Sequence, residues 1–141
     1  LRRQRQMCIR DRGYSIGQVA KKTGLSVHTL RYYEKEGLLP FVRKNSSGLR
    51  VFSDSDLGWL ELIECLKATG LHLKGIKQYI DWYIEGDSTL QLRLDMFRQQ
   101  KIRIEEQMAE LQKHMNKINY KIELYTKAVA AGTLHPEKKS A

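Results

Sequence analysis

Two short segments near the N-terminal end carry apolar residues at helical spacing. In the first, Ser15 and Gln18 have the spacing of a capping box, and Gly24 is placed to end the helix. In the second, Ser26 can cap a helix that Gly37 would stop. Two short helices joined by a glycine-containing turn are typical of a helix-turn-helix, whose second helix enters the DNA major groove.

A β-hairpin is predicted directly after these helices. Short runs at 41–43 and 49–52 flank Lys44-Asn45-Ser46-Ser47-Gly48, a segment rich in turn-forming residues. The hairpin would form a wing beside the helix-turn-helix, with Phe52 more suited to the core than to a DNA contact.

Two more helices are predicted after the wing. Ser53 and Asp56 form a second capping box, which opens a helix over 54–69 that Gly70 ends. Its apolar face is predicted to consist of Trp59, Leu62, Ile63 and Leu66. A further helix is expected from about 72 to 83, followed by a stop and a new cap in 85–88. Its apolar positions are Leu73, Ile76, Tyr79, Ile80 and Tyr83.

The most regular pattern in the sequence lies at the C-terminal end. Positions that alternate steps of four and three form one stripe, here called the seam: Leu90, Leu94, Phe97, Lys101, Ile104, Met108, Leu111, Met115, Ile118, Ile122, Tyr125 and Val129. A long helix cannot bury such a stripe alone, so we expect a coiled coil between two copies of the chain. The alternative, a helix folded back on its own head, lacks a segment long enough to cover the seam. Lys101 interrupts the seam, and it either fixes the register or extends its charge outward.

These elements predict an all-α fold with a small β-hairpin wing, in which a winged helix-turn-helix head precedes a long C-terminal dimerisation helix. The expected divisions are a disordered or non-native leader (1–13), the DNA-binding domain (14–86), the dimerisation helix (87–130) and a disordered tail (131–141).

The charge distribution points to a polyanionic partner. The chain has a formal net charge of +9, and residues 1–52 carry 12 basic and 3 acidic side chains whereas residues 53–141 carry 13 of each. Without the leader, residues 13–52 still hold 7 basic and 2 acidic groups. A basic excess confined to one segment is the expected signature of nucleic-acid binding.

Several other classes of protein are disfavoured. No apolar run has the length that a membrane span needs, and the chain is expected to be cytoplasmic. Cys8 and Cys65 make neither a disulfide framework nor a zinc site, so they are expected to be reduced thiols. The sequence has no glycine-rich phosphate loop, no metal spacing and no carboxylate pair near a histidine, so we expect neither an enzyme nor a cofactor.

The chain resembles the mercury-resistance-regulator (MerR) family of bacterial transcription factors over residues 14 to about 129. The motifs that carry the resemblance are Ile16-Gly17-Gln18-Val19-Ala20, Thr29-Leu30-Arg31-Tyr32-Tyr33-Glu34, Gly37-Leu38-Leu39-Pro40 and Arg50-Val51-Phe52. The resemblance implies an antiparallel dimer on a pseudo-palindromic promoter whose spacer is too long. An activated dimer would bend and untwist that spacer, so that RNA polymerase can engage both promoter elements.

Motif position and side-chain chemistry together indicate the DNA contacts. The guanidinium of Arg31 suits guanine edges or phosphate. One of the adjacent Tyr32 and Tyr33 should reach phosphate while the other packs, because successive helix positions point about 100° apart. The full set expected at the DNA is Ser15, His28, Thr29, Arg31, Tyr32, Tyr33, Arg43, Lys44 and Arg50.

The effector is the least determined part of the sequence interpretation. Metal-sensing members of the family use cysteines near the end of the dimer helix, but this chain has no cysteine after residue 88, which disfavours metal sensing. Drug-binding members have a large domain after the helix, where this sequence has only TLHPEKKSA, which disfavours drug binding. The segments 59–65 and 85–89 resemble the branch of the family associated with aldehydes and other electrophiles, in which a cysteine at the position of Cys65 is the proposed sensor. Cys65 lies about 120° from the centre of its helix's apolar stripe, which favours access. Its acidic neighbours Glu61 and Glu64 disfavour the reactive thiolate.

Three alternatives stay open at this point. Cys65 can be a purely structural residue in a regulator with another effector. An excisionase-like architectural protein would share the winged helix and the basic charge, but it would not need the long seam. A coiled-coil adaptor would explain the seam, but not the basic head.

Overall fold

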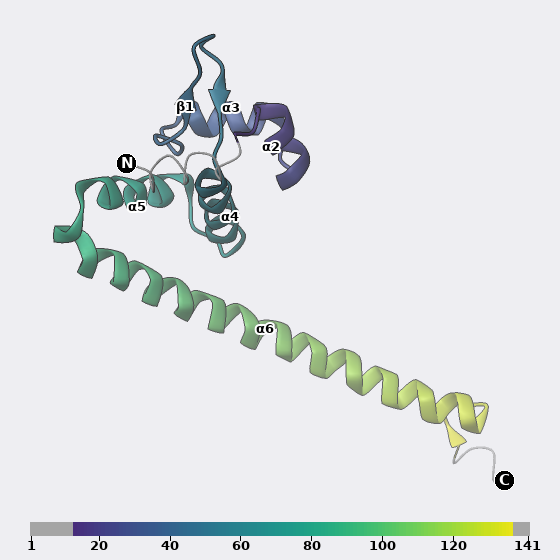
Figure 1. Ribbon diagram of the computed structural model, residues 1–141. Coiled ribbons are helices and arrows are strands. Elements are labelled where there is room, and N and C mark those ends of the chain that lie inside the picture. The colour runs from purple at the N-terminus through teal and green to yellow at the C-terminus, as the bar shows by residue number, and fades with distance from the viewer. Residues whose placement is uncertain (1–12, 137–141) are drawn as a thin grey trace, which may run out of the picture. The chain divides into compact units, whose positions relative to one another are not determined.

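The computed structural model describes residues 13–136, and the predicted leader with Cys8 lies outside them. Figure 1 shows the order of elements. They are α2 (Ile16–Thr23), α3 (Val27–Lys35), β1 (Arg43–Lys44), β2 (Arg50–Val51), α4 (Asp54–Ala68), α5 (Leu73–Glu85), the short 3-10 helix η1 (Asp87–Thr89) and α6 (Leu90–Ala131). Helices and one two-stranded hairpin confirm the predicted fold class.

The first two helices form the predicted helix-turn-helix. The Ser15 side chain accepts a hydrogen bond from the Gln18 backbone, and the Gln18 side chain accepts one from the Ser15 backbone, which completes the capping box. Gly24 ends α2 in the left-handed conformation at φ 76°, where a side chain would be strained. Ser26 then caps α3 by accepting from the Thr29 amide. The turn between the helices is therefore fixed by local contacts.

The wing is shorter than the sequence runs that predict it. Its two strands pair antiparallel with Arg43 opposite Val51 and Lys44 opposite Arg50. The side chain of Asn45 accepts from the amides of Ser47 and Leu49 and so closes the turn. Phe41 and Val42, predicted as part of the first strand, lie outside it: Val42 is buried in the core and the half-buried Phe41 packs against it. Phe52 is fully buried as expected and forms a bridge with Tyr14.

Helix α4 packs its buried face against the helix-turn-helix and α5. The Ser53–Asp56 capping box is present. The predicted apolar face is only partly right: Ile63 and Leu66 are buried, but Trp59 and Leu62 are half-buried, and the fully buried residue missed by the prediction is Leu60. The helix is covered on two sides, by α2 and by α5, so its buried surface is wider than a single stripe.

The first turns of α6 pack against α4 and α5. Thr89 in η1 is buried and donates from its hydroxyl to the carbonyls of Trp82 and Gly86, which fixes the reversal between α5 and α6. The side chain of the buried Gln100 donates to the Thr69 hydroxyl at 2.9 Å. An aromatic cluster fills the space between: Phe41, Trp59, Tyr79, Tyr83 and Phe97.

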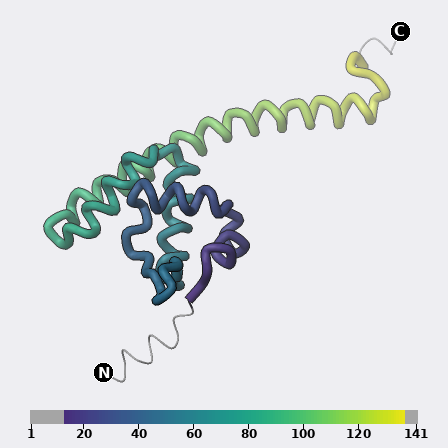
Figure 2. Tube along the Cα trace, turned by 90° about the horizontal axis from the view of Figure 1, so that it is seen from above, coloured from purple at the N-terminus to yellow at the C-terminus, as the bar shows by residue number. Residues whose placement is uncertain are grey.

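Helix α6 runs without interruption for 42 residues, and Figure 2 follows its trace from green to yellow. The chain divides into two compact units after Gln100, inside this helix, whereas the predicted domain boundary lies at residue 86. We call residues 13–100 the head and residues 101–131 the distal part of α6. Within the described residues, no helix combines the length and the apolarity that crossing a membrane requires.

Candidate nucleic-acid interface

The exposed face of α3 gathers the side chains expected to contact DNA. His28, Arg31 and Tyr32 are all exposed, and Tyr32 keeps 44% of its surface accessible. Lys35, in the last turn, is exposed and lies seven residues after His28, so it shares this face. The sequence interpretation missed Lys35, although the helical spacing from His28 could have identified it. The exposed face of α3 is therefore rich in hydrogen-bond donors. Figure 1 shows α3 beside the β-hairpin wing.

Tyr33 is the tyrosine of the pair that packs, and its inclusion among the DNA contacts was wrong. Its side chain is 1% exposed and belongs to the core. Its hydroxyl donates to the Glu64 carboxylate at 2.5 Å and accepts from the Lys67 ammonium at 2.6 Å. Since the hydroxyl is occupied inside the fold, it cannot reach a phosphate.

Two polar residues expected at the DNA also serve as helix caps. Ser15 is exposed and closes the capping box of α2. The Thr29 hydroxyl lies 2.9 Å from the Ser26 hydroxyl at the start of α3. Both residues stand at helix N-terminal ends, where backbone N–H groups favour an anion such as phosphate. Their positions are therefore compatible with DNA contact.

The wing carries its basic residues in two different environments. Arg43 and Lys44 are exposed on β1. Arg50 on β2 instead forms an ion pair with Glu34 of α3 and donates to the Val42 carbonyl at 3.3 Å. Arg50 therefore ties the wing to α3, while Arg43 and Lys44 remain available to a partner.

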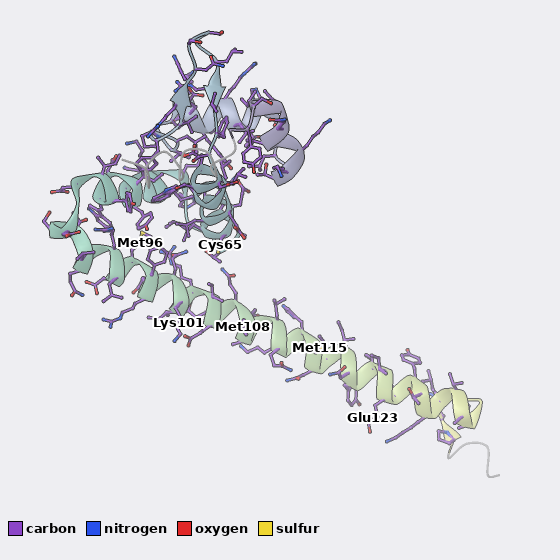
Figure 3. The ribbon with its side chains drawn as sticks, in the orientation of Figure 1. Cys65, Met96, Lys101, Met108, Met115 and Glu123 are labelled. Atoms are coloured by element: carbon purple, nitrogen blue, oxygen red, sulfur yellow. The ribbon has the colours of Figure 1, made fainter. Side chains whose placement is uncertain are left out.

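Cys65 lies in the last turns of α4 with an exposed free thiol. Figure 3 labels it together with Met96 of α6, which is half-buried against the core. The nearby cation Lys67 is engaged with Tyr33 and Glu64. The prediction that Cys65 lies off the core face is confirmed, because the side chain is exposed.

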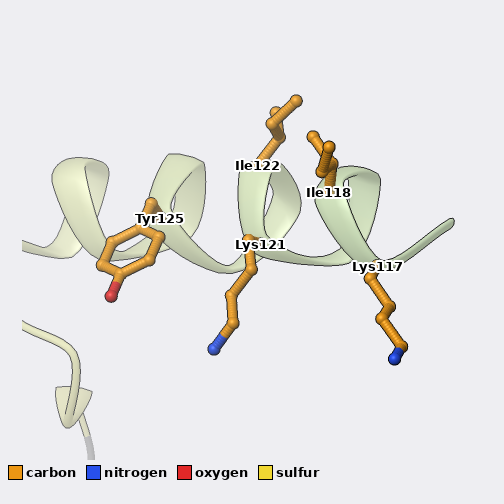
Figure 4. A pocket seen from close by; sticks show the side chains of 5 residues that line it. All are labelled: Lys117, Ile118, Lys121, Ile122 and Tyr125. Carbon is orange, nitrogen blue, oxygen red and sulfur yellow. The ribbon is translucent and has the colours of Figure 1, made fainter. Parts of the chain in front are cut away.

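The seam residues of α6 fall into two groups. Phe97 packs edge-on against Tyr79 at 5.2 Å between ring centroids, so this seam position already belongs to the head. Beyond Gln100, seven apolar seam residues are exposed in the single chain: Met108, Leu111, Met115, Ile118, Ile122, Tyr125 and Val129. Figure 4 shows a short stretch of this helix, in which Ile118 and Ile122 point to one side of the view while Tyr125 points to the other side with Lys117 and Lys121. Lys101 is exposed as well.

These features define the class of protein as a winged helix-turn-helix DNA-binding protein. They are a helix-turn-helix with an exposed basic face, a β-hairpin wing with exposed Arg43 and Lys44, and a long helix with an apolar stripe. Comparison with known families agrees with this class. The profile "MerR HTH family regulatory protein" matches residues 14–81, and the profile "MerR, DNA binding" matches residues 57–119.

Relatives extend the match over most of the chain. An uncharacterized HTH-type transcriptional regulator of Haemophilus influenzae is 44% identical over 121 residues, which cover 86% of this chain and 90% of the relative. The HTH-type transcriptional regulator AdhR of Bacillus subtilis is 38% identical over 90 residues, which cover 64% of each chain. The chain belongs to the MerR family and is a DNA-binding transcriptional regulator of that type.

Solved structures show the same architecture. HiNmlR, described as "a MerR family regulator lacking the sensor domain, bound to promoter DNA", superposes with a TM-score of 0.77 at 43% identity, over 87% of this chain and 98% of that one. A MerR family regulator from Bacillus thuringiensis superposes with a TM-score of 0.71 at 44% identity, over 79% and 98%. The relative HiNmlR, whose structure covers most of this chain, is therefore a protein that binds promoter DNA.

Proposed function

We propose that two copies of the chain pair through the seam of α6 and bind a pseudo-palindromic promoter whose spacer is too long. The observation that carries this proposal is the row of exposed apolar residues on the distal part of α6, in a chain whose head can recognise one half-site. Pairing two heads by two-fold symmetry matches the two half-sites of an inverted repeat. Because promoters are in the bacterial cytoplasm, the protein acts there.

In this proposal α3 is the recognition helix and the wing contacts the sugar-phosphate backbone. His28, Arg31 and Tyr32 enter the major groove, with Arg31 placed for a guanine edge or a phosphate. Arg43 and Lys44 contact the backbone or the minor groove, and Ser15 and Thr29 add phosphate contacts from their helix ends. Arg50 contributes by holding the wing against α3 through Glu34.

The regulatory action is proposed to be a distortion of the promoter. A dimer that bends and untwists the overlong spacer aligns the two promoter elements for RNA polymerase, at a cost set by DNA deformability. The DNA-bound structure of the relative HiNmlR supports this choice over an excisionase-like role.

The test combines oligomeric state, DNA binding and spacer length. Sedimentation should give a dimer, and run-off transcription should be activated on the promoter with its natural overlong spacer but not on one whose spacer is shortened to the optimal length. Arg31→Gln should weaken operator binding, whereas Lys113→Gln, an exposed change on the distal part of α6, should not. Activation that does not depend on spacer length would reject the proposal in favour of a simple architectural protein.

The proposed signal is a reactive aldehyde that modifies Cys65. The thiol sulfur would form a bond to the carbonyl carbon, the C=O π bond would break, and the thiol proton would end on the oxygen to give a hemithioacetal. No oxidant is needed. The exposure of the thiol supports access for such a reagent.

Run-off transcription before and after formaldehyde or methylglyoxal distinguishes the two effector hypotheses. If wild type and Cys65→Ser bind the promoter equally but only wild type is activated, Cys65 is the sensor. If both respond alike, or neither responds, Cys65 is structural and the regulator has another effector.

A further inference from the structure

Tyr33 connects the recognition helix to α4 through a part-buried polar contact at the edge of the core, since Glu64 and Lys67 keep 38% and 39% of their side-chain surface exposed. The hydroxyl donates to Glu64 at 2.5 Å and accepts from Lys67 at 2.6 Å, and the Lys67 ammonium lies 5.1 Å from the centre of the Tyr33 ring. Glu64 and Lys67 are 3.9 Å apart on successive turns of α4. One tyrosine thus joins an acid and a base that both belong to another helix.

The contact is well placed to control the orientation of α3. Arg31 and Tyr32, the two residues directly before Tyr33, lie on the proposed DNA-contacting face. Glu34, the next residue, forms the ion pair with Arg50 of the wing. The recognition helix is therefore held to α4 by one residue and to the wing by its neighbour.

A hydroxyl is not required at this position for packing alone. The ring of Tyr33 already lies in the core together with Leu30 and Leu38, and a phenylalanine would fill the same apolar space. The hydroxyl adds directionality, because hydrogen bonds to charged groups depend strongly on geometry and are stronger than neutral ones. Rotation or sliding of α3 on α4 would break both bonds.

We propose that Tyr33 is a positioning residue for DNA recognition, whose hydroxyl fixes the recognition helix on α4 through Glu64 and Lys67. The inference rests on the proposed role of α3 as the recognition helix. It assigns Tyr33 an indirect role in binding, in contrast to its exposed neighbour Tyr32. Cys65 lies between Glu64 and Lys67 on the same turns of α4.

The experiment measures operator and non-specific DNA binding at several salt concentrations by fluorescence anisotropy, corrected for the active fraction by stoichiometric titration. The variants are Tyr33→Phe, the matched control Tyr120→Phe at an exposed tyrosine of α6 outside the proposed DNA surface, Arg31→Gln, and the charge-neutral pair Glu64→Met with Lys67→Met. We expect Tyr33→Phe to weaken operator binding about three- to tenfold while non-specific binding stays the same. The dependence on salt should keep its slope, because no phosphate contact is lost.

The charge-neutral background tests whether the effect acts through α4. In the chain that carries Glu64→Met and Lys67→Met, Tyr33→Phe should have no further effect on operator binding, because the partners of the hydroxyl are already absent. Circular dichroism verifies that each variant is folded. If the chain with both methionine substitutions does not fold, Lys67→Met alone replaces it. Tyr33→Phe should then change the logarithm of the operator dissociation constant by at most half as much as it does in the wild-type chain.

Two outcomes overturn the inference. Unchanged operator binding by Tyr33→Phe shows that the hydroxyl has no positioning role. A salt slope reduced by about one in Tyr33→Phe would show a direct phosphate contact instead. Arg31→Gln separates this result from the proposed function: if Arg31→Gln weakens binding and Tyr33→Phe does not, only the inference fails, whereas unchanged binding in both variants rejects α3 as the recognition helix.

Discussion

The core of the head and the distal part of α6 bury their apolar residues to very different degrees. In the head, Leu30, Ile63 and Ile76 are at most 1% exposed, because other helices of the same chain cover them. On the distal part of α6, between 51% and 65% of the surface stays exposed at each of six seam residues: Met108, Leu111, Met115, Ile118, Ile122 and Tyr125. Both regions carry apolar residues at helical spacing. The difference is that the head supplies its own partner surfaces. A single helix cannot do so, and this is why we propose that a second copy of the chain buries the distal part of α6.

Substitutions in the two regions should therefore act on different properties of the protein. A change in the head core should lower the free energy of unfolding of the head, while a change on the seam should alter association. Changes at helix caps and at the Tyr33 contact should have smaller effects that stay within the head.

The largest effect is expected from a charge on the seam. Ile118→Asp would place a carboxylate in the proposed dimer interface, where an unpaired buried charge is strongly unfavourable. We expect the dimer dissociation constant to rise by at least about a hundredfold, measured by sedimentation velocity over a range of concentrations.

The control for the seam is Tyr120→Asp. Tyr120 is 65% exposed on the same helix but lies outside the seam, so this variant should remain a dimer. Equal dissociation by both variants, or by neither, would contradict the assignment of the interface.

Truncation of the head core should come next in size. Leu30→Ala removes a fully buried side chain and should lower the free energy of unfolding by about 2–5 kcal/mol, measured by urea denaturation. Leu49→Ala on the exposed part of the wing should change it by less than about 0.5 kcal/mol. Similar values for the two variants would mean that the core is not where the structure places it.

Loss of a helix cap should be smaller. Ser53→Ala removes the acceptor for the Asp56 amide at the start of α4 and should cost about 1 kcal/mol in the same denaturation assay. Ser55→Ala, in the first turn of the same helix and exposed, serves as the control and should not destabilise. A cost for Ser55→Ala as large as that for Ser53→Ala would reject the capping role.

The smallest effect concerns alkaline pH. Burial and the bond to Glu64 raise the pKa of Tyr33 above its usual 10.0, and the bond to Tyr33 raises the pKa of Lys67 above its usual 10.5. A raised pKa in the folded state favours the protonated form, so the stability from this contact is fully present below pH 10 and is lost as pH rises through the raised values.

Denaturation between pH 8 and pH 11 checks this sign. Wild type should lose more stability above pH 10 than Tyr33→Phe, which lacks the contact, while Tyr120→Phe at an exposed position should follow wild type. A Tyr33→Phe variant that loses as much stability as wild type over this range would contradict the expected titration.

Much of the fold could be predicted because its signals are local. A capping serine and its partner three residues later, or a glycine at the end of a helix, act through contacts within one turn. This is why the bounds of α2, α3 and α4 agree with the pattern at Ser15, Ser26 and Ser53. The seam of α6 and the basic excess of residues 1–52 were also visible in the sequence, since helical spacing and charge are properties of the chain itself.

The remaining features depend on which surfaces meet. Tyr32 and Tyr33 are identical in type and adjacent, and only the position of α4 decides that Tyr33 is buried against Glu64 and Lys67 while Tyr32 stays exposed. In the same way, Leu60 becomes core because α4 is covered on two sides, and Arg50 turns inward because Glu34 lies opposite it. The sequence by itself determined where helices begin and end and where charge and apolar surface lie along them. The tertiary structure decided which of those side chains face one another, because contacts between residues far apart in the chain arise only when the helices pack.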